Sequence, residues 1–227
     1  MIPGILKEIE EALRTAGLTA SEKVMGEGRG GSLKDEGTVI DFLLAHPTIG
    51  PRVMETPPRR PGDFMAQDDN GVWHPVNIKT STGTYDNATS KLGFLYAYTD
   101  LDYDDLPGRI TWNTLYDKLN SHKKDVPGRD YYFLFLDKRD MSKVLVRGTR
   151  QITHWFENAN PSNLLQIIWR KEVEEAPKEQ SFEEAYDTVI GGIGRCMGKT
   201  VHSWPPEFFV EGHPVREAFL ARIAKKD

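Results

Sequence analysis

Residues 59–81 read RRPGDFMAQDDNGVWHPVNIKTS, and this stretch predicts the centre of the fold. Two runs with strand-like composition flank residues 68–71. The Asn70-Gly71 pair within that segment supplies the positive φ values that a tight hairpin turn needs. We therefore predict two antiparallel strands joined through this segment.

The second of these strands has an alternating pattern. Because side chains point to opposite faces along a strand, Val76 and Ile78 should enter the core while Asn77 and Lys79 share the other face. Asp63 lies on the neighbouring strand, where the hairpin can fold it back toward that pair. A carboxylate, an amide and an ammonium group should therefore converge at one end of a sheet.

That combination suits the attack of water on a phosphodiester. A carboxylate and a backbone carbonyl of the following strand can hold a hard divalent cation, and Mg²⁺ keeps several waters when it is bound in this way. The metal lowers the pKa of its water and neutralises phosphate charge, while a lysine orients the nucleophile or stabilises developing charge. The pattern thus favours metal-dependent hydrolysis.

The same residues carry a resemblance to a known family. Pro61-Gly62-Asp63, thirteen residues and then Asn77-Ile78-Lys79 resemble the PD-(D/E)xK nuclease signature. The wider context is similar to type II restriction endonucleases of the EcoRV/HincII group, through Asp86-Asn87-Ala88 and Ser90-Lys91. The resemblance implies an α/β restriction-endonuclease-like fold, a mixed sheet flanked by helices. It also implies that Asp63 and the Ile78 carbonyl hold Mg²⁺, with Lys79 orienting the attacking water.

Two positions depart from the family pattern. Gly62 separates Pro61 from Asp63, at the least constrained part of the signature. Asn77 stands where a second carboxylate is usual, and an amide oxygen can bind a metal but brings no charge. A minority of restriction enzymes carry Asn or Gln there, so Asn77 is interpreted as a weak ligand. The alternative is that Asp63 is a turn residue and Lys79 a solvated strand end.

Glu36 is a further candidate. Ser32 and Asp35 form a variant capping box that predicts a helix over residues 32–45. Glu36 lies on its apolar stripe, formed by Leu33, Glu36, Ile40 and Leu43. A buried carboxylate is costly unless something binds it, and EcoRV-like enzymes carry a glutamate on the helix before the catalytic hairpin. Glu36 would then bind or position the metal. The alternative is that Glu36 lies at the start of the helix because its negative charge interacts favourably with the helix dipole.

Several polar residues are candidates for contacts with DNA. Small hydrogen-bonding side chains follow the second strand, and such groups suit phosphates and base edges. Arginines lie in the glycine-rich segment 26–31, read as a mobile loop or linker, and in the proline-rich segment 51–61, expected to lack regular structure. All of these charges could equally be solvated. The candidates are Arg29, Arg59, Arg60, Thr80, Ser81, Asn87, Ser90 and Lys91.

Composition describes a soluble globular protein, with 28% charged and 38% hydrophobic residues among 227. A chain of this length is expected to form a single domain that spans residues 1–227. The net charge of −5 argues against general coating of nucleic acid, although a segregated basic cleft stays possible. No apolar run is long enough for a membrane span, the N-terminus does not resemble a signal peptide, and Cys196 stands alone. We expect a cytoplasmic protein.

The remaining elements follow from periodicity and caps. Helices are predicted over 3–16, from Thr111, from a capping box at Ser181 and Glu184, and over 214–225. Strands are predicted over 131–136, 144–147 and 164–169, and residues 92–98 fit a strand or a short helix. Residues 194–200 resemble a P-loop, but the glycine spacing is one residue short and the preceding residues read as helix. The six histidines lack paired metal spacing.

Together these observations predict a type II restriction endonuclease that depends on Mg²⁺, cuts double-stranded DNA and acts as a homodimer. A repair or junction-resolving nuclease on the same fold is one alternative. A DNA-binding module that lost cleavage with the second carboxylate is another.

Overall fold

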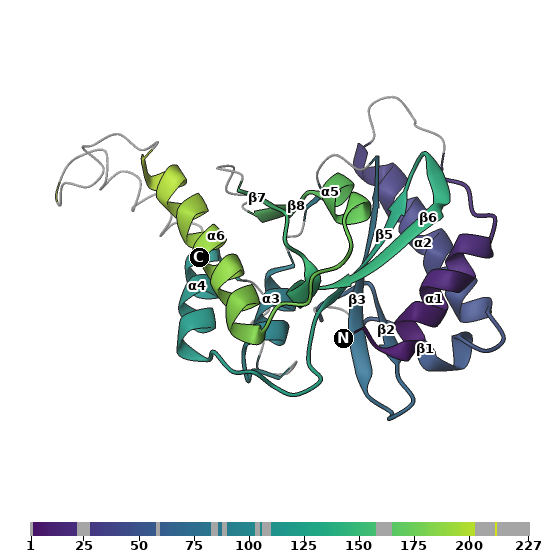
Figure 1. Cartoon of the computed structure of the whole chain (residues 1–227), viewed down its shortest axis with the longest axis horizontal. Coiled ribbons are helices and arrows are strands. Elements are labelled where there is room, and N and C mark those ends of the chain that lie inside the picture. Colours follow the sequence, from purple (N-terminus) through teal and green to yellow (C-terminus); the bar gives the residue numbers. More distant parts are fainter. Residues whose placement is uncertain are drawn as a thin grey trace.

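The computed structural model describes residues 2–21, 28–57, 60–82, 86–87, 90–102, 105, 110–157, 165–202 and 212. A five-stranded sheet in the order β1-β2-β3-β5-β6 forms its centre (Figure 1). Only β3 and β5 are parallel, and every other neighbouring pair is antiparallel. The strands are β1 (Val53–Glu55), β2 (Phe64–Gln67), β3 (Trp73–Ser81), β5 (Tyr132–Asp137) and β6 (Asp140–Gly148). The expected mixed sheet flanked by helices is confirmed.

The predicted hairpin is formed by β2 and β3. Gln67 pairs with Trp73, so residues 68–72 connect the strands, one residue more than the predicted segment 68–71. Asp68 Oδ1 accepts the backbone N–H groups of Asn70 and Val72, both at 2.9 Å. Gly71 has a φ of 79°, the left-handed conformation that glycine adopts readily. The loop is longer than the prediction because Asp68 organises it as well as the Asn-Gly pair.

Helices α1 (Gly4–Thr15) and α2 (Gly28–Ala45) cover one face of this sheet (Figure 1). α1 is confirmed, and it buries Ile5, Leu6, Ile9 and Leu13. The capping box at Ser32 is wrong, since α2 begins at Gly28 and residues 28–31 are helical rather than a loop. Asp35 instead accepts the Ser21 N–H at 2.7 Å and pairs with Lys138 at 3.0 Å.

The buried stripe of α2 is also rotated from the prediction. Leu33 is 66% exposed, whereas Asp35, Val39 and Leu43 are buried at i, i+4 spacing. Glu36 and Ile40 are half-buried at the margin of this stripe. Glu36 therefore borders the core instead of entering it, because the tertiary contacts of Asp35 set the rotation of the helix.

The proline-rich segment 51–61 was expected to be irregular, and this is wrong in part. It contains the end of the 3₁₀ helix η1 (Gly50–Arg52) and the edge strand β1. β1 pairs only with β2 within the described residues. A three-residue strand is too short to produce a periodic signal, so the sequence could not reveal it.

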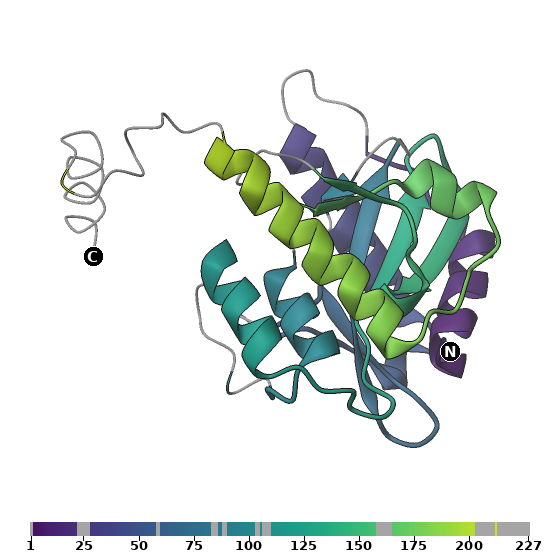
Figure 2. The ribbon, with the colours of Figure 1, turned by 60° about the vertical axis from the view of Figure 1, so that its left-hand side comes forward.

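The other face carries a second group of helices and a small sheet (Figure 2). Residues 92–98 are helical, and Thr111 and Ser181 begin helices as predicted. The strand expected over 164–169 is shorter, because Trp169 starts a helix. This face is formed by α3 (Lys91–Tyr98), α4 (Trp112–Ser121), α5 (Trp169–Glu174), α6 (Phe182–His202), β4 (Asp86–Asn87), β7 (Trp155–Glu157) and β8 (Leu165–Ile167), with η2 (Thr149–Gln151) after β6.

Two predictions on the C-terminal part have different outcomes. Residues 194–200 lie inside α6, so they do not form the loop that a P-loop requires. The helix expected over 214–225 lies outside the described residues. Within the described chain, the helices are too short or too polar to span a bilayer.

Candidate active site

The candidate site lies where β2 begins beside the longer strand β3. β2 pairs with β3 only over residues 73–76, while β5 pairs with residues 76–81 on the other side. Among the described residues, no strand therefore covers residues 77–81 on the side of β2. This leaves an open edge of the sheet beside Asp63, the residue that precedes β2.

Asp63 is bound to that open edge. Its Oδ2 accepts the backbone N–H of Ile78 at 2.6 Å, and its own N–H donates to the Val76 carbonyl at 2.7 Å. Gly62 permits this approach because its φ is 93° and a Cβ there would lie 2.9 Å from the Val76 oxygen. The expected return of Asp63 toward the second strand is thus present, with named contacts.

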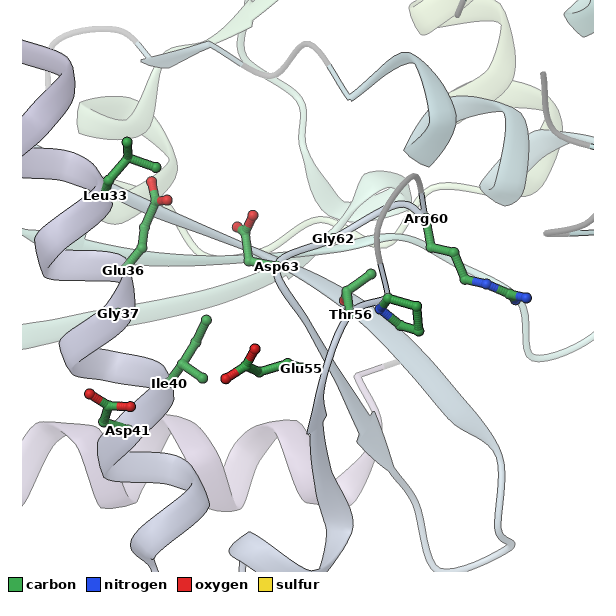
Figure 3. Close-up of a pocket in the computed structure, with 11 residues that line it drawn as sticks. Leu33, Glu36, Gly37, Ile40, Asp41, Glu55, Thr56, Arg60, Gly62 and Asp63 are labelled. Carbon is green, nitrogen blue, oxygen red and sulfur yellow. The ribbon is translucent and has the colours of Figure 1, made fainter. Parts of the chain in front are cut away.

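Asp63 also lines a pocket of about 440 Å³ between α2 and the β1–β2 region. Figure 3 shows Glu36 on α2 across this pocket from Asp63, and Glu55 pointing from β1 toward α2. Arg60 lines the pocket but extends away from the carboxylates. Four carboxylates therefore border one space: Glu36 and Asp41 from α2, Glu55 from β1 and Asp63 just before β2. Neither Asp41 nor Glu55 gave a signal in the sequence.

Burial raises the pKa of the Asp63 carboxyl above its usual range. The Ile78 N–H and the charge of Lys79 lower that pKa but do not cancel the effect of burial. The carboxylate form is therefore less stable here than in water. A cation at this position would favour the charged form, because opposite charges attract strongly in a partly buried site.

Asn77 and Lys79 share one face of β3, as the alternation predicts. Val76 and Ile78 are fully buried in the core beneath α1 and α2, whereas Asn77 and Lys79 are half-buried on the opposite face. There Asn77 lies opposite Phe133 of β5. Asn77 Oδ1 is buried and accepts no hydrogen bond from the described residues. An amide oxygen without a donor is available to a ligand.

Other buried polar groups among the described residues share this feature. The hydroxyls of Thr56, Thr80 and Tyr131 are also buried and lack a hydrogen-bond partner among the described residues. Thr56 lines the same pocket as Asp63, and Thr80 follows Lys79 on β3. Native structures leave few buried polar groups unsatisfied, so the Thr56 hydroxyl in this pocket is available to a ligand or a water.

The donors at the open edge fit a hard cation. Within the described residues, no three His, Cys, Asp or Glu side chains come close enough together to hold a metal by themselves. However, the N–H of Ile78 points to Asp63. Because the N–H and C=O of one strand residue face the same edge of the sheet, the Ile78 carbonyl also faces the side of Asp63. The Asp63 carboxylate, the Ile78 carbonyl and Asn77 Oδ1 form the all-oxygen set, with one carboxylate, that suits Mg²⁺ with its waters.

Several of the DNA-contact candidates make contacts within the fold among the described residues. Thr80 is buried, and the Ser81 carbonyl accepts the Lys138 N–H at 2.9 Å. Ser90 caps α3 by accepting the Gly93 N–H, and Lys91 Nζ donates to the Ile110 carbonyl at 2.9 Å. Both thus have structural contacts. Arg59 and the side chains of Arg29 and Asn87 lie outside the described residues.

Comparisons with protein-family models, with curated proteins and with solved structures give no match. The class of the protein is therefore argued from its residues and their arrangement.

Proposed function

We propose that this chain is a metal-dependent phosphodiesterase built on a mixed sheet. The observation that carries the proposal is the bond from the Ile78 N–H to Asp63 Oδ2 at the open edge of the strand that bears Asn77 and Lys79. It places a carboxylate beside a backbone carbonyl, an unsatisfied amide oxygen and an ammonium group. Hydrolysis of a phosphodiester by water uses this set of groups.

The particular protein that we propose is a type II restriction endonuclease acting on double-stranded DNA as a homodimer. The order of elements supports this: α2, the antiparallel strands β1, β2 and β3, helix α3, and then β5 parallel to β3. A restriction-endonuclease-like fold has this order around the PD-(D/E)xK residues that the chain resembles. The dimer follows from the need to cut two antiparallel strands with one site per chain.

Each residue of the site has a role in this proposal. Asp63, the Ile78 carbonyl and Asn77 would hold Mg²⁺, and Glu36 would help to position it from α2. When bound, Mg²⁺ would lower the pKa of a water molecule and neutralise charge on the phosphate. Lys79 orients the attacking water and stabilises the charge that develops on the phosphate. Asn77 is neutral, and burial disfavours the charged form of Asp63. The site therefore carries less negative charge than a site with two carboxylates would.

Asn77 also favours a second candidate, a DNA-binding module that does not cleave. A neutral amide in place of the second carboxylate weakens metal binding. This candidate keeps the fold and the DNA contact but lacks turnover.

The test is incubation of supercoiled plasmid and phage DNA with protein and Mg²⁺. We expect discrete fragments that EDTA prevents, and a loss of at least about a hundredfold in cleavage rate for Lys79→Ala. Lys143→Ala is the matched control, since Lys143 is 63% exposed on β6 and pairs only loosely with Asp140 at 3.9 Å.

The other outcomes separate the alternatives. Nicks that depend on DNA structure would indicate a repair or junction-resolving nuclease. Gel retardation without cleavage would indicate the binding module. Cleavage by Lys79→Ala at the wild-type rate would show that the active site has been assigned wrongly.

A further inference from the structure

The small sheet β4-β8-β7 has one face in the core and one face outside it. Leu165 and Ile167 of β8 are fully buried in the apolar cluster that includes side chains of α3, α4 and α6. Gln166 lies between them, so its side chain points to the opposite face, where it is half-buried. On β7, Trp155 packs against the cluster and Phe156 is 40% exposed. The outer face of the small sheet therefore carries Gln166 and Phe156.

Strand register places these two residues side by side. Phe156 pairs with Gln166 across the antiparallel strands β7 and β8. On the other side of β8, Asn87 of β4 pairs with Gln166. Directly opposite residues of an antiparallel pair have Cβ atoms roughly 5 Å apart. Asn87, Gln166 and Phe156 thus occupy neighbouring positions on three adjacent strands.

The chemistry of the outer face suits the edges of bases. The major groove of B-DNA admits a two-stranded β-ribbon, and β7 and β8 form such a pair. A glutamine amide can bind N6 and N7 of adenine with two hydrogen bonds, and phenylalanine can contact the methyl group of thymine. Glu157 is the one carboxylate of β7 and β8, and Arg195 Nε donates to it at 2.7 Å. Its repulsion of phosphates is therefore compensated.

The small sheet also lies at the end of the molecule that carries the candidate active site. Asp86, the first residue of β4, follows Lys79 by seven positions. Figures 1 and 2 show β7 and β8 toward the end of the central sheet at which β3 ends, while the β2–β3 connection lies at the other end. One bound duplex can therefore contact both the site and the small sheet.

We propose that Gln166 is a specificity-determining residue that reads an adenine in the major groove of the DNA. The inference rests on the proposed function, since it names a base of that same substrate. Asn87 is a candidate from its sequence context, whereas Gln166 lies 79 positions further along and joins it only through strand pairing. The amide of Gln166 supplies both a donor and an acceptor, which the N7 and N6 groups of adenine match.

The experiment compares Gln166→Ala with Gln67→Ala. Gln67 is also a half-buried strand glutamine, but it lies beside the β2–β3 connection, where its Nε2 donates to the Gly71 carbonyl at 3.0 Å. Phage DNA is digested in the presence of Mg²⁺, and sequencing of the fragment ends gives the selectivity for each base at each position. Gln166→Glu keeps the size of the side chain and takes the place of Gln166→Ala if that variant does not fold.

We expect wild type to select adenine at one position of each half-site. Gln166→Ala should select that adenine at least about tenfold less strongly, with the other positions unchanged, and Gln67→Ala should match wild type. Replacing the adenine by 7-deazaadenine, which lacks the N7 acceptor, should slow wild type by a similar factor. The same replacement should have little further effect on Gln166→Ala, because the contact is already absent.

Three outcomes would overturn this inference alone. They are a wild-type site without adenine, undiminished selectivity of Gln166→Ala, and an equal loss of selectivity at all positions, which a disturbed fold would produce. If wild type binds DNA without cleaving it, sequencing of the duplexes that it retains gives the same selectivities and the same decision. If wild type neither cleaves nor retains DNA, the proposed function fails, and this inference fails with it.

Discussion

Replacing Asp63 by Asn should stabilise the metal-free protein and remove its response to Mg²⁺. The amide oxygen can still accept the Ile78 N–H, but the variant no longer places a charge in the half-buried pocket that Glu36 and Glu55 also line. Single stabilising substitutions are commonly worth about 1 kcal/mol, and functional sites are often destabilised in the native protein. For a chain of this length that corresponds to an increase of roughly 2–4 °C in Tm.

The pH dependence of this gain in stability follows from the direction in which the pKa of Asp63 is shifted. Burial raises the pKa of Asp63, so its protonated form is favoured in the folded state and stability is lost as pH rises through the folded pKa. The gain from Asn is therefore full at neutral pH. It disappears at a pH below the ordinary range of an aspartate, where Asp63 is itself protonated.

Mg²⁺ should reverse the order of the melting temperatures of wild type and Asp63→Asn. At a free concentration ten times its Kd, a ligand stabilises the folded state by RT ln 11, about 1.4 kcal/mol. The wild-type Tm should then rise by roughly 3–6 °C, while that of Asp63→Asn stays constant. Differential scanning fluorimetry of both proteins, with and without Mg²⁺ and at neutral and acidic pH, measures these melting temperatures.

Asp35→Asn is the control, because Asp35 is an aspartate that is only 2% exposed but has partners for its charge. Burial alone would raise the pKa of Asp35, but the Ser21 N–H and Lys138 outweigh it and lower the pKa. This variant should be less stable than wild type and should still respond to Mg²⁺. The reasoning is refuted if Asp63→Asn melts below wild type at neutral pH without metal, or if its Tm rises with Mg²⁺ as wild type does.

Two further predictions concern the metal and the assembly. Asn77→Asp adds a charge at the buried amide position, so half-maximal cleavage should need about tenfold less Mg²⁺, and Asn77→Ala should need more; coinciding midpoints would place Asn77 away from the metal. Sedimentation should reveal a homodimer, free or on specific DNA, because two strands are cut with one site per chain; a monomer under both conditions would contradict it.

Local patterns in the sequence were sufficient for much of the architecture. The 3.6-residue spacing of Ile5, Leu6, Ile9 and Leu13 predicts α1, and the caps at Thr111 and Ser181 predict α4 and α6. The alternation along residues 76–79 correctly assigns Asn77 and Lys79 to one face of β3. These features succeed because periodicity and capping depend on residues that are close in the chain.

Other features depended on contacts that the sequence does not encode locally. Leu33 is exposed and Glu36 only borders the core, because the bonds of Asp35 to Ser21 and Lys138 set the rotation of α2. Residues 92–98 are uniformly apolar, so only packing against α4 and the sheet selects a helix over a strand. β1 exists only as a partner of β2.

The candidate site divides in the same way. The sequence by itself determined which chemical groups β3 and the start of β2 carry, since Asp63, Asn77 and Lys79 follow from a motif and a strand period. Only the tertiary structure decided that Asp63 accepts the Ile78 N–H and that Glu55 borders the same pocket. The reason is physical: these relations are set by strand register, which joins residues 6 to 12 positions apart in the β2–β3 pair and 56 positions apart in the β3–β5 pair.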